Sequence, residues 1–213
     1  MPSLADLRKE YTKDKLDAAT VAREPIAQFE KWLSEALNAG ITEPTAFTLA
    51  TVSKSGRPSA RIVLLKGVEE GCFLFYTNYQ SQKGKELSEN PAVALNFFWV
   101  DLERQVRIEG IAERVSEEKA TAYFQSRPLE SQIGAWASPQ SAVLADRSIL
   151  EKRVTEVLKK FTGLDKLPKP KQWGGYSVEP YLIEFWQGRP GRLHDRIVYT
   201  KAESGWKISR LAP

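Results

Sequence analysis

The 213-residue sequence contains only one cysteine, one histidine and one methionine. The single cysteine, Cys72, excludes an internal disulfide framework, and its place in the apolar run CFLFYTN predicts a buried, unreactive thiol. One cysteine and one histidine cannot assemble a Cys/His zinc site, so we expect no bound metal. A reducing compartment is the simplest context for such a chain.

Long apolar runs and several well-known motifs are also absent. No stretch approaches the roughly 18 apolar residues of a membrane span, and the N-terminal MPSLADLRKEYTKDK has no apolar signal core. We therefore expect a cytoplasmic protein with no membrane partner. The sequence lacks the phosphate loop G-x-x-x-x-G-K-[ST], the dinucleotide fingerprint G-x-G-x-x-G and the nucleophile elbow G-x-S-x-G. Nucleotide binding of those types and serine hydrolysis through His194 are thus disfavoured.

Acidic residues are slightly outnumbered, which gives a net charge of +4 and a pI near 9.1 in an otherwise ordinary globular composition. Nucleic acid, a membrane surface or phosphorylated small molecules are all compatible with this balance, and so is a merely soluble basic surface. The lysines of KFTGLDKLPKPK (160–171) alternate with Pro, Gly and Asp. This pattern predicts a solvated linker rather than a polybasic arm.

Hydrophobic periodicity indicates an α+β protein. Residues 24–40 predict a helix with an apolar face made by Ile26, Phe29, Leu33 and Leu37, and further helices are expected at 116–127 and 141–161. Strands are expected at 45–53, 59–67, 71–78, 92–100, 103–115, 176–187, 192–200 and 205–211. Short strands joined mainly by tight turns favour an antiparallel barrel with flanking helices.

Two of these strands carry specific expectations about burial. The run RIVLL (61–65) is apolar on both faces, which predicts a central, buried strand with Arg61 and Lys66 at its ends. Along 103–115, Val106, Ile108 and Ala112 alternate with polar residues. That alternation predicts a half-exposed strand.

Cations and hydroxyls gather at the ends of the expected elements. A strand starting at Arg192 would project Arg192, His194 and Arg196 on one face, an arrangement suited to an anion, although solvated surface arginines would look the same. Two further groups suit phosphates. Tyr123, Arg127 and Ser131 lie around Pro128, although a helix-end arginine stacked on a tyrosine would look the same. Ser81 and Lys83 lie at a helix N-terminus that follows Tyr76-Thr77, although N-capping alone would explain Ser81.

The stretch IEFWQGRPGRLHDR (183–196) contains E-F-W-Q, four variable positions and R-L-H-D-R. It is accompanied, in order along the chain, by RIVLLK (61–66), FYTN (75–78), ERQVR (103–107), YFQSRP (123–128), SQIGAW (131–136), Gln140-Ser141 and WKISRLAP (206–213). This series resembles the pyridoxamine 5′-phosphate oxidase family, flavin enzymes that make pyridoxal 5′-phosphate. The resemblance covers essentially the whole chain.

The resemblance implies an FMN-binding split β-barrel that works as a homodimer with its sites at the subunit interface. Residues 1–40 would form a helical segment that packs and closes over substrate, and 41–213 the barrel domain with a helical insertion (116–172) and C-terminal strands (176–211). FMN would be held by Arg61, Ile62, Val63, Leu64, Leu65, Lys66, Tyr76, Thr77, Gln82, Lys83, Gln105, Gln140, Ser141, Trp186 and Arg196. Substrate would be bound by Arg8, Tyr11, Lys66, Tyr123, Arg127, Ser131, Arg192 and His194, of which Arg192 and His194 would be the catalytic pair.

Two positions depart from the family pattern. Gln82 stands where the family often has arginine beside the lysine, and Glu43 stands where an aspartate is common near the substrate amine. The implied reaction is the oxidation of pyridoxamine 5′-phosphate and pyridoxine 5′-phosphate by O₂, with release of hydrogen peroxide. The alternatives are a split-barrel flavin reductase and a basic barrel that binds nucleic acid without catalysis.

Overall fold

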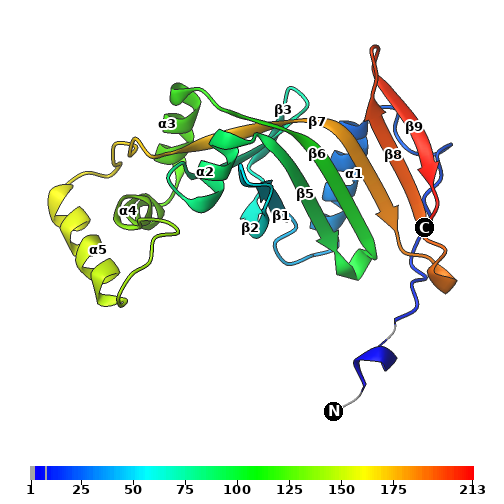
Figure 1. The fold of residues 1–213 in the computed structure, drawn as a ribbon, viewed down its shortest axis with the longest axis horizontal. Coiled ribbons are helices and arrows are strands. Elements are labelled where there is room, and N and C mark those ends of the chain that lie inside the picture. Colours follow the sequence, from blue (N-terminus) through cyan, green and yellow to red (C-terminus); the bar gives the residue numbers. More distant parts are fainter. Residues whose placement is uncertain (1–2, 8) are drawn as a thin grey trace.

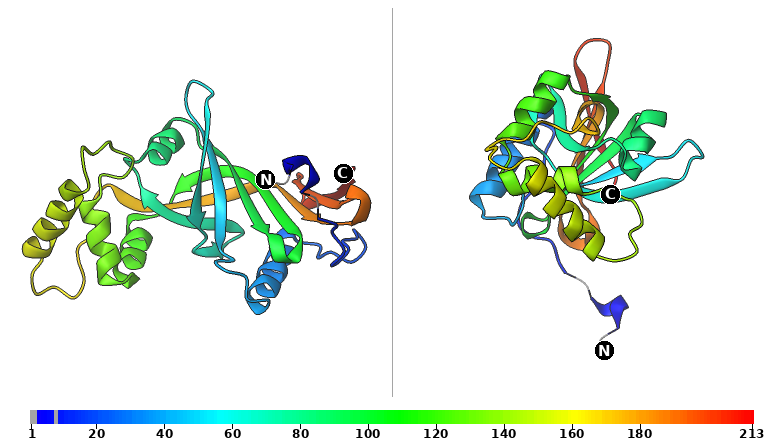
Figure 2. Two further views of the ribbon diagram at one scale, coloured as in Figure 1. Left: turned by 90° about the horizontal axis from the view of Figure 1, so that it is seen from below. Right: turned by 90° about the vertical axis from the view of Figure 1, so that its left-hand side faces the viewer.

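The alternating segments of the sequence pair into one antiparallel sheet, seen in a computed structural model that describes residues 3–7 and 9–213 (Figure 1). Its strands are β1 (Ala46–Val52), β2 (Pro58–Leu64), β3 (Gly67–Glu69), β4 (Cys72–Asn78), β5 (Ala92–Trp99), β6 (Arg104–Arg114), β7 (Trp173–Gln187), β8 (Asp195–Lys201) and β9 (Trp206–Leu211). The order is β2-β1-β5-β6-β7-β4-β3, and β8 pairs with β7 and β9. The sheet curls like part of a barrel, which confirms the predicted α+β class (Figures 1 and 2).

Helices flank this sheet. They are α1 (Pro25–Asn38), α2 (Gln82–Glu89), α3 (Glu117–Ser126), α4 (Leu129–Ala137) and α5 (Ser148–Lys160), with short 3₁₀ helices at Leu4–Asp6, Val100–Leu102 and Pro190–Arg192. Within residues 3–7 and 9–213, no helix is long and apolar enough to cross a membrane.

Helix α1 closes the main hydrophobic core against one face of the sheet (Figure 2). The ring of Phe29 meets Phe73 and Phe97 edge to face at 5.0 and 5.1 Å between centroids, and Trp32 meets Phe185 at 5.2 Å. The predicted apolar face is wrong at its end, because Leu37 is 56% exposed. The buried stripe runs instead through Phe29, Trp32 and Ala36, which share one helix face.

Strand β7 connects two ends of an elongated molecule. One edge of β7 pairs with β6, and the other pairs first with β4 and then with β8. At its first end, α3, α4 and α5 enclose a second cluster that includes Phe124, Leu167 and Trp173. At its far end lie β8 and β9 (Figure 1). Val106, Ile108 and Ala112 of β6 are buried, as their alternation predicts.

Residues 61–65 do not form a central strand. They belong mostly to β2, which pairs with β1 at the edge of the sheet, and Ile62 is 64% exposed. Apolar residues on both faces of a strand therefore do not establish that both faces are buried within the same chain.

The helical region also differs from expectation. Pro128 was expected to end one helix and does, but it is also the N-cap of α4, a helix the periodicity does not predict. Helix α5 begins at Ser148 rather than at 141, because the chain between α4 and α5 follows a loop in which Ser141 has φ 70°.

Two expectations about exposure are wrong. The second half of 160–171 is anchored rather than solvated, since Leu167 is buried and the Lys169 ammonium pairs with Glu117 at 2.8 Å and donates to the Trp173 carbonyl at 2.8 Å. Cys72 is only partly buried, because it starts β4 directly after the turn at Gly71.

The buried carboxylate of Glu86 fastens α2 to β1 and β2. Its Oε2 accepts hydrogen bonds from Thr51 and, at 2.7 Å, from Ser59, and it pairs with Nη2 of Arg61 at 3.2 Å. Its Oε1 accepts from Gln82 at 2.9 Å. Burial alone would raise the pKa of Glu86, but these hydrogen bonds and the charge of Arg61 lower the pKa from 4.5 to about 2.

Replacing Glu86 should change acid stability. Because the folded-state pKa lies below the unfolded value, the carboxylate contributes stability that is fully present above pH 4.5 and is lost as the pH falls towards about 2. We expect Glu86→Gln to lower the free energy of unfolding at pH 7 by about 1–3 kcal/mol, the usual penalty for an unsatisfied buried group. It should also flatten the loss of stability in that acid range. Urea titrations at a series of pH values measure both effects.

The matched control is Glu89→Gln, an exposed carboxylate on the same helix, which should keep the original pH profile. A Glu86→Gln profile parallel to that of the unaltered chain would contradict the role of Glu86.

Candidate functional site

A cavity of about 450 Å³ lies where the ends of β2 and β4 meet α2, α3 and α4. It collects most of the residues predicted to bind a phosphorylated ligand and its cofactor, namely Ile62, Val63, Leu64, Lys66, Tyr76, Thr77, Lys83, Tyr123, Arg127, Ser131 and Gln140. Segments more than 70 positions apart in the sequence thus contribute to one concave polar surface.

Arg127 is the most unusual group in this cavity. The turn at Pro128 takes it out of α3, and Gln132 fixes the turn by donating to the Arg127 carbonyl at 2.8 Å. Its guanidinium lies 4.9 Å from the centre of the Trp173 ring, and burial lowers its pKa. Its buried Nη1 has no hydrogen-bond partner among the described residues. A buried cationic donor without an acceptor is costly, so it fits an anionic ligand.

Three aromatic rings form one wall beside Arg127. Tyr76 stacks on Tyr123 at 3.9 Å between centroids and on Trp173 at 5.5 Å. Burial raises the pKa of both tyrosines, although Arg127 partly opposes this at Tyr123. Both phenols therefore remain protonated at neutral pH and can donate hydrogen bonds.

Lys83 supplies a second cation at the opening of α2. Ser81 caps this helix by accepting from the Gly84 N–H at 3.3 Å, and a Cβ at Gly84 would lie 2.4 Å from the Tyr79 carbonyl oxygen. Lys83 is 8% exposed, and its ammonium donates to the Gln140 amide oxygen at 3.1 Å. Burial and the nearby Arg61 lower its pKa. The Lys83 charge therefore faces an amide rather than a carboxylate.

Seven of the residues predicted to hold FMN do not line this cavity, namely Arg61, Leu65, Gln82, Gln105, Ser141, Trp186 and Arg196. Arg61 turns its guanidinium to Glu86, and Leu65 belongs to the core. Gln82 and Ser141 line an adjoining cavity of about 630 Å³, which also includes Asn78 and Gln140.

A separate cavity of about 510 Å³ lies at the far end of β7, lined by Leu7, Lys9, Glu10, Tyr11, Arg189, Gly191, Arg192 and His194. The strand expected to start at Arg192 starts later in the structure. Gly191 and Arg192 both have φ 62°, and β8 begins only at Asp195. Arg192, His194 and Arg196 therefore do not alternate along one strand, because this left-handed turn breaks the extended backbone.

His194 is held as a neutral ring. Its Nδ1 accepts the backbone N–H of Arg189 at 3.1 Å, so the proton of the neutral imidazole is on Nε2. Its ring lies 4.6 Å from Trp186 and 5.8 Å from Tyr11 between centroids. Burial lowers the pKa of His194, and Arg192 lowers it further. At neutral pH His194 is therefore a hydrogen-bond donor through Nε2.

Gln105, Trp186 and Arg196 lie side by side on β6, β7 and β8, because the register pairs Gln105 with Trp186 and Trp186 with Arg196. Arg196 donates to Glu184 at 2.7 Å and to the Ala212 carbonyl at 2.9 Å. The hydrogen bond to Glu184 raises the pKa of Arg196. This row belongs to the far end of the molecule.

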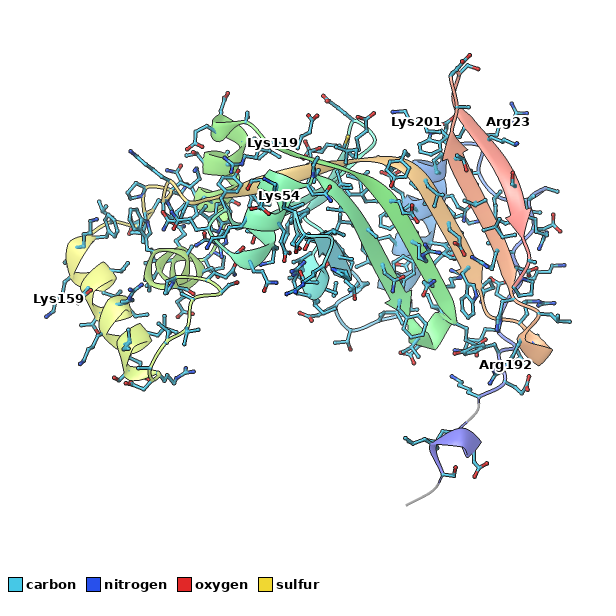
Figure 3. All side chains as sticks on the ribbon, in the orientation of Figure 1. Arg23, Lys54, Lys119, Lys159, Arg192 and Lys201 are labelled. Carbon is cyan, nitrogen blue, oxygen red and sulfur yellow. The ribbon has the colours of Figure 1, made fainter. Side chains whose placement is uncertain are left out.

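The predicted site is therefore divided within one chain. Figure 3 shows Lys159 of α5 at one end of the molecule and Arg192 at the other. Glu43 lines none of these three cavities and instead borders a fourth, with Ile62 and Asn96. Arg8 lies outside the described residues.

Sequence reasoning missed Asn78, Ser138 and Trp173 in the first cavity. Trp173 stood before the expected start of its strand at 176, so no periodicity marked it as an inward-facing residue. The Gly-Gly pair after Trp173 was the available sequence signal of a close approach between backbone and side chain. In the structure, a Cβ at Gly174 would lie 2.0 Å from the Tyr79 hydroxyl.

Sequence comparison connects both ends of the molecule to one family. Residues 33–161 match the family described as "Pyridoxamine 5′-phosphate oxidase", and residues 173–213 match the "Pyridoxine 5′-phosphate oxidase C-terminal dimerisation region". Curated relatives from Burkholderia mallei (strain SAVP1) and Burkholderia thailandensis, both named pyridoxine/pyridoxamine 5′-phosphate oxidase, are 56% identical over 216 residues. Each comparison covers 100% of both chains.

Solved structures share the fold. PhzG from Burkholderia lata 383, in complex with tetrahydrophenazine-1-carboxylic acid, has a TM-score of 0.88 at 32% identity, covering 94% of this chain and 98% of that one. An FMN binding, pyridoxamine 5′-phosphate oxidase-related protein from Nostoc punctiforme PCC 73102 has a TM-score of 0.70 at 18% identity, covering 87% and 97%, and supports the fold alone. The chain folds as a split barrel and belongs to the pyridoxamine 5′-phosphate oxidase family.

Proposed function

We propose that this chain oxidises pyridoxamine 5′-phosphate and pyridoxine 5′-phosphate to pyridoxal 5′-phosphate, using FMN and O₂ and releasing hydrogen peroxide. The observation that carries the proposal is the buried, unpartnered Nη1 of Arg127 in a cavity shared with Lys66, Tyr123 and Ser131. A phosphate monoester would accept from all four donors. The activity would serve vitamin B6 biosynthesis and salvage in the cytoplasm.

The residues around Lys83 fit the phosphate of FMN. A buried ammonium whose hydrogen-bond acceptor is an amide can take an anion without first breaking an ion pair, and the capped N-terminus of α2 lies beside it. We propose that FMN is held by Lys83, Thr77, Gln140, residues 62–64 and Lys66 on one side, and by Gln105, Trp186 and Arg196 on the other. FMN would supply the redox chemistry, since it can accept a hydride equivalent and return electrons to O₂.

This chain's own residues would position the substrate. Lys66, Tyr123, Arg127 and Ser131 would fix its phosphate and so hold the reacting carbon at one place. His194 would donate from Nε2 to a substituent of the pyridine ring. Arg192 would disfavour the protonated form of a nearby substrate amine, because two cations repel, and so would favour the amine that can be oxidised.

The division of these residues between two cavities favours a homodimer. Strand β7 carries Trp173 in the first cavity and Trp186 at the far end, a separation of roughly 40 Å at about 3.3 Å per residue. One small ligand cannot span that distance. We propose that the first cavity is completed by the dimerisation region of a partner subunit, the region that contains Trp186, Arg192, His194 and Arg196.

The likeness to PhzG gives a second candidate, oxidation of a reduced aromatic carboxylic acid such as the one in that complex. A carboxylate could also accept from Arg127. The 56% identity to named phosphate oxidases over the full chain favours the phosphorylated substrate.

A flavin spectrum and peroxide release test the proposal. The purified protein should absorb as a flavoprotein and release peroxide with pyridoxine 5′-phosphate at least about 100-fold more efficiently than with pyridoxine. Pyridoxine has no phosphate and cannot make the contacts to the four donors, which accounts for that difference. Peroxide from tetrahydrophenazine-1-carboxylic acid alone would support the second candidate. A colourless protein that binds oligonucleotides in a salt-dependent way would contradict both.

Arg127→Ala should raise KM for pyridoxine 5′-phosphate by roughly 10- to 150-fold, since a hydrogen bond to a charged group is worth about 1.5–3 kcal/mol. The flavin content should be unchanged. Steady-state peroxide assays give KM, and Arg153→Ala, an exposed arginine on α5, is the matched control. An unchanged KM in Arg127→Ala would remove Arg127 from the substrate site.

Lys83→Ala should weaken FMN binding by about 10- to 100-fold, because it removes a poorly solvated cation from the proposed phosphate site. Titration of the apoprotein by quenching of FMN fluorescence measures this affinity. Lys54→Ala removes the same charge from the exposed turn between β1 and β2 and should bind FMN normally. Equal affinities in the two variants would place the cofactor phosphate elsewhere.

A further inference from the structure

An N-terminal strap, defined here as residues 9–16, lies along the loop that carries Arg192 and His194. The strap forms no helix or strand, so its attachment depends on individual hydrogen bonds. The Gly191 N–H donates to Glu10 at 3.3 Å, Arg189 donates to the Asp14 carbonyl at 3.0 Å, and the Leu16 N–H donates to Asp195 at 3.0 Å. The strap is thus one wall of the cavity around His194.

The middle of the strap is held by Arg104, which donates to the Asp14 carboxylate at 2.8 Å, and by the buried carboxylate of Glu103. Oε2 of Glu103 accepts the backbone N–H groups of Thr12 at 2.9 Å and Lys13 at 3.0 Å, 91 and 90 positions away in the sequence. Glu103 is 2% exposed. Extended backbone outside a sheet needs such acceptors, and a carboxylate makes the stronger hydrogen bonds.

Glu103 also contacts the loop from the same position. Its backbone carbonyl accepts the Gly188 N–H at 2.8 Å and the Gln187 side chain at 3.2 Å. It has φ 55°, a left-handed conformation that is unfavourable for a residue with a side chain. Side chain and backbone of Glu103 therefore join the strap to the loop, at a position where glycine would be less strained.

Tyr11 depends on this junction. Its ring packs edge to face on Trp186 at 5.7 Å and lies 5.8 Å from the His194 ring between centroids. Gly188 leaves room for it, because a Cβ there would lie 2.7 Å from Cγ of Tyr11. Tyr11 directly precedes Thr12, whose N–H is held by Glu103, so the Glu103 carboxylate fixes the backbone next to this ring.

We propose that Glu103 is a positioning residue for substrate binding: its carboxylate holds the strap so that Tyr11 packs against His194 and closes that side of the substrate site. This inference rests on the proposed function, in which His194 contacts the substrate. Glu103 itself touches neither substrate nor cofactor.

The test compares two variants that displace Tyr11 from different elements. Glu103→Gly removes the carboxylate and suits the positive φ, and Gly188→Ala places a methyl group against Tyr11 while leaving the carboxylate intact. Both should raise KM for pyridoxine 5′-phosphate at least 10-fold, with kcat within about twofold and FMN content unchanged. Glu103→Gln keeps an acceptor oxygen and should recover most of the affinity.

Limited trypsin digestion supplies a readout that does not depend on turnover. Cleavage after Lys13 and Lys15 should be at least 10-fold faster in Glu103→Gly than in the unaltered chain. Glu113→Ala removes an exposed carboxylate from β6 and should change neither KM nor cleavage.

The possible failures are distinguishable. Faster cleavage in Glu103→Gly with an unchanged KM would show that the strap is only structural and would overturn this inference while leaving the proposed function intact. Absence of peroxide from the unaltered chain with pyridoxine 5′-phosphate would overturn the proposed function and this inference with it.

Discussion

The arrangement of the whole molecule depends on one constraint, the pairing of β7 with two different strands along one edge. Its first half pairs with β4 and its second half with β8, while β6 runs beside it on the other edge. This places Trp173 beside the helices and Trp186 beside His194. A continuous strand cannot fold back on itself, so the distance between the two groups is fixed by its length. Assembly with a second copy follows as a geometric requirement of the proposed site.

Three cations in the first half of the site are stabilised in three different ways. Arg61 is paired with a buried carboxylate and is therefore neutralised within the chain. Lys83 has an amide as acceptor, and Arg127 lies over an aromatic ring with one donor unmatched. Among the described residues Lys83 and Arg127 form no ion pair, so an incoming anion need not displace a carboxylate from either. Gln82 also donates to Glu86. Arg61 is thus part of the hydrogen-bonded group around Glu86 and contributes to stability, in contrast to Lys83 and Arg127.

Local pattern predicted the sheet and the cations and hydroxyls of the first cavity, whereas Ile62, Val63, Leu64 and Gln140 were expected only from the family resemblance. Alternation identified the buried face of β6, and the spacing around Pro128 brought Arg127 towards Ser131. The predictions that failed share one physical cause: they concern features that the pattern of neighbouring residues does not determine. The apolar run 61–65 does not reveal that β2 lies at an edge, and the left-handed turn at Gly191 is not encoded by alternation. The separation of the two cavities depends on which strands β7 pairs with, and no single segment contains that information.

The pairing of β7 also limits how such a chain can evolve. The two family regions that it matches meet near the start of β7, which suggests two modules. Yet β7 supplies partners to β4 and β6, and Val178, Ile183 and Phe185 lie in the same core as Phe29 of α1. A gene cut between the regions would encode two fragments with unpaired strand edges and an open core. The boundary that separates them in sequence is thus no boundary for folding, and the two parts must be inherited together.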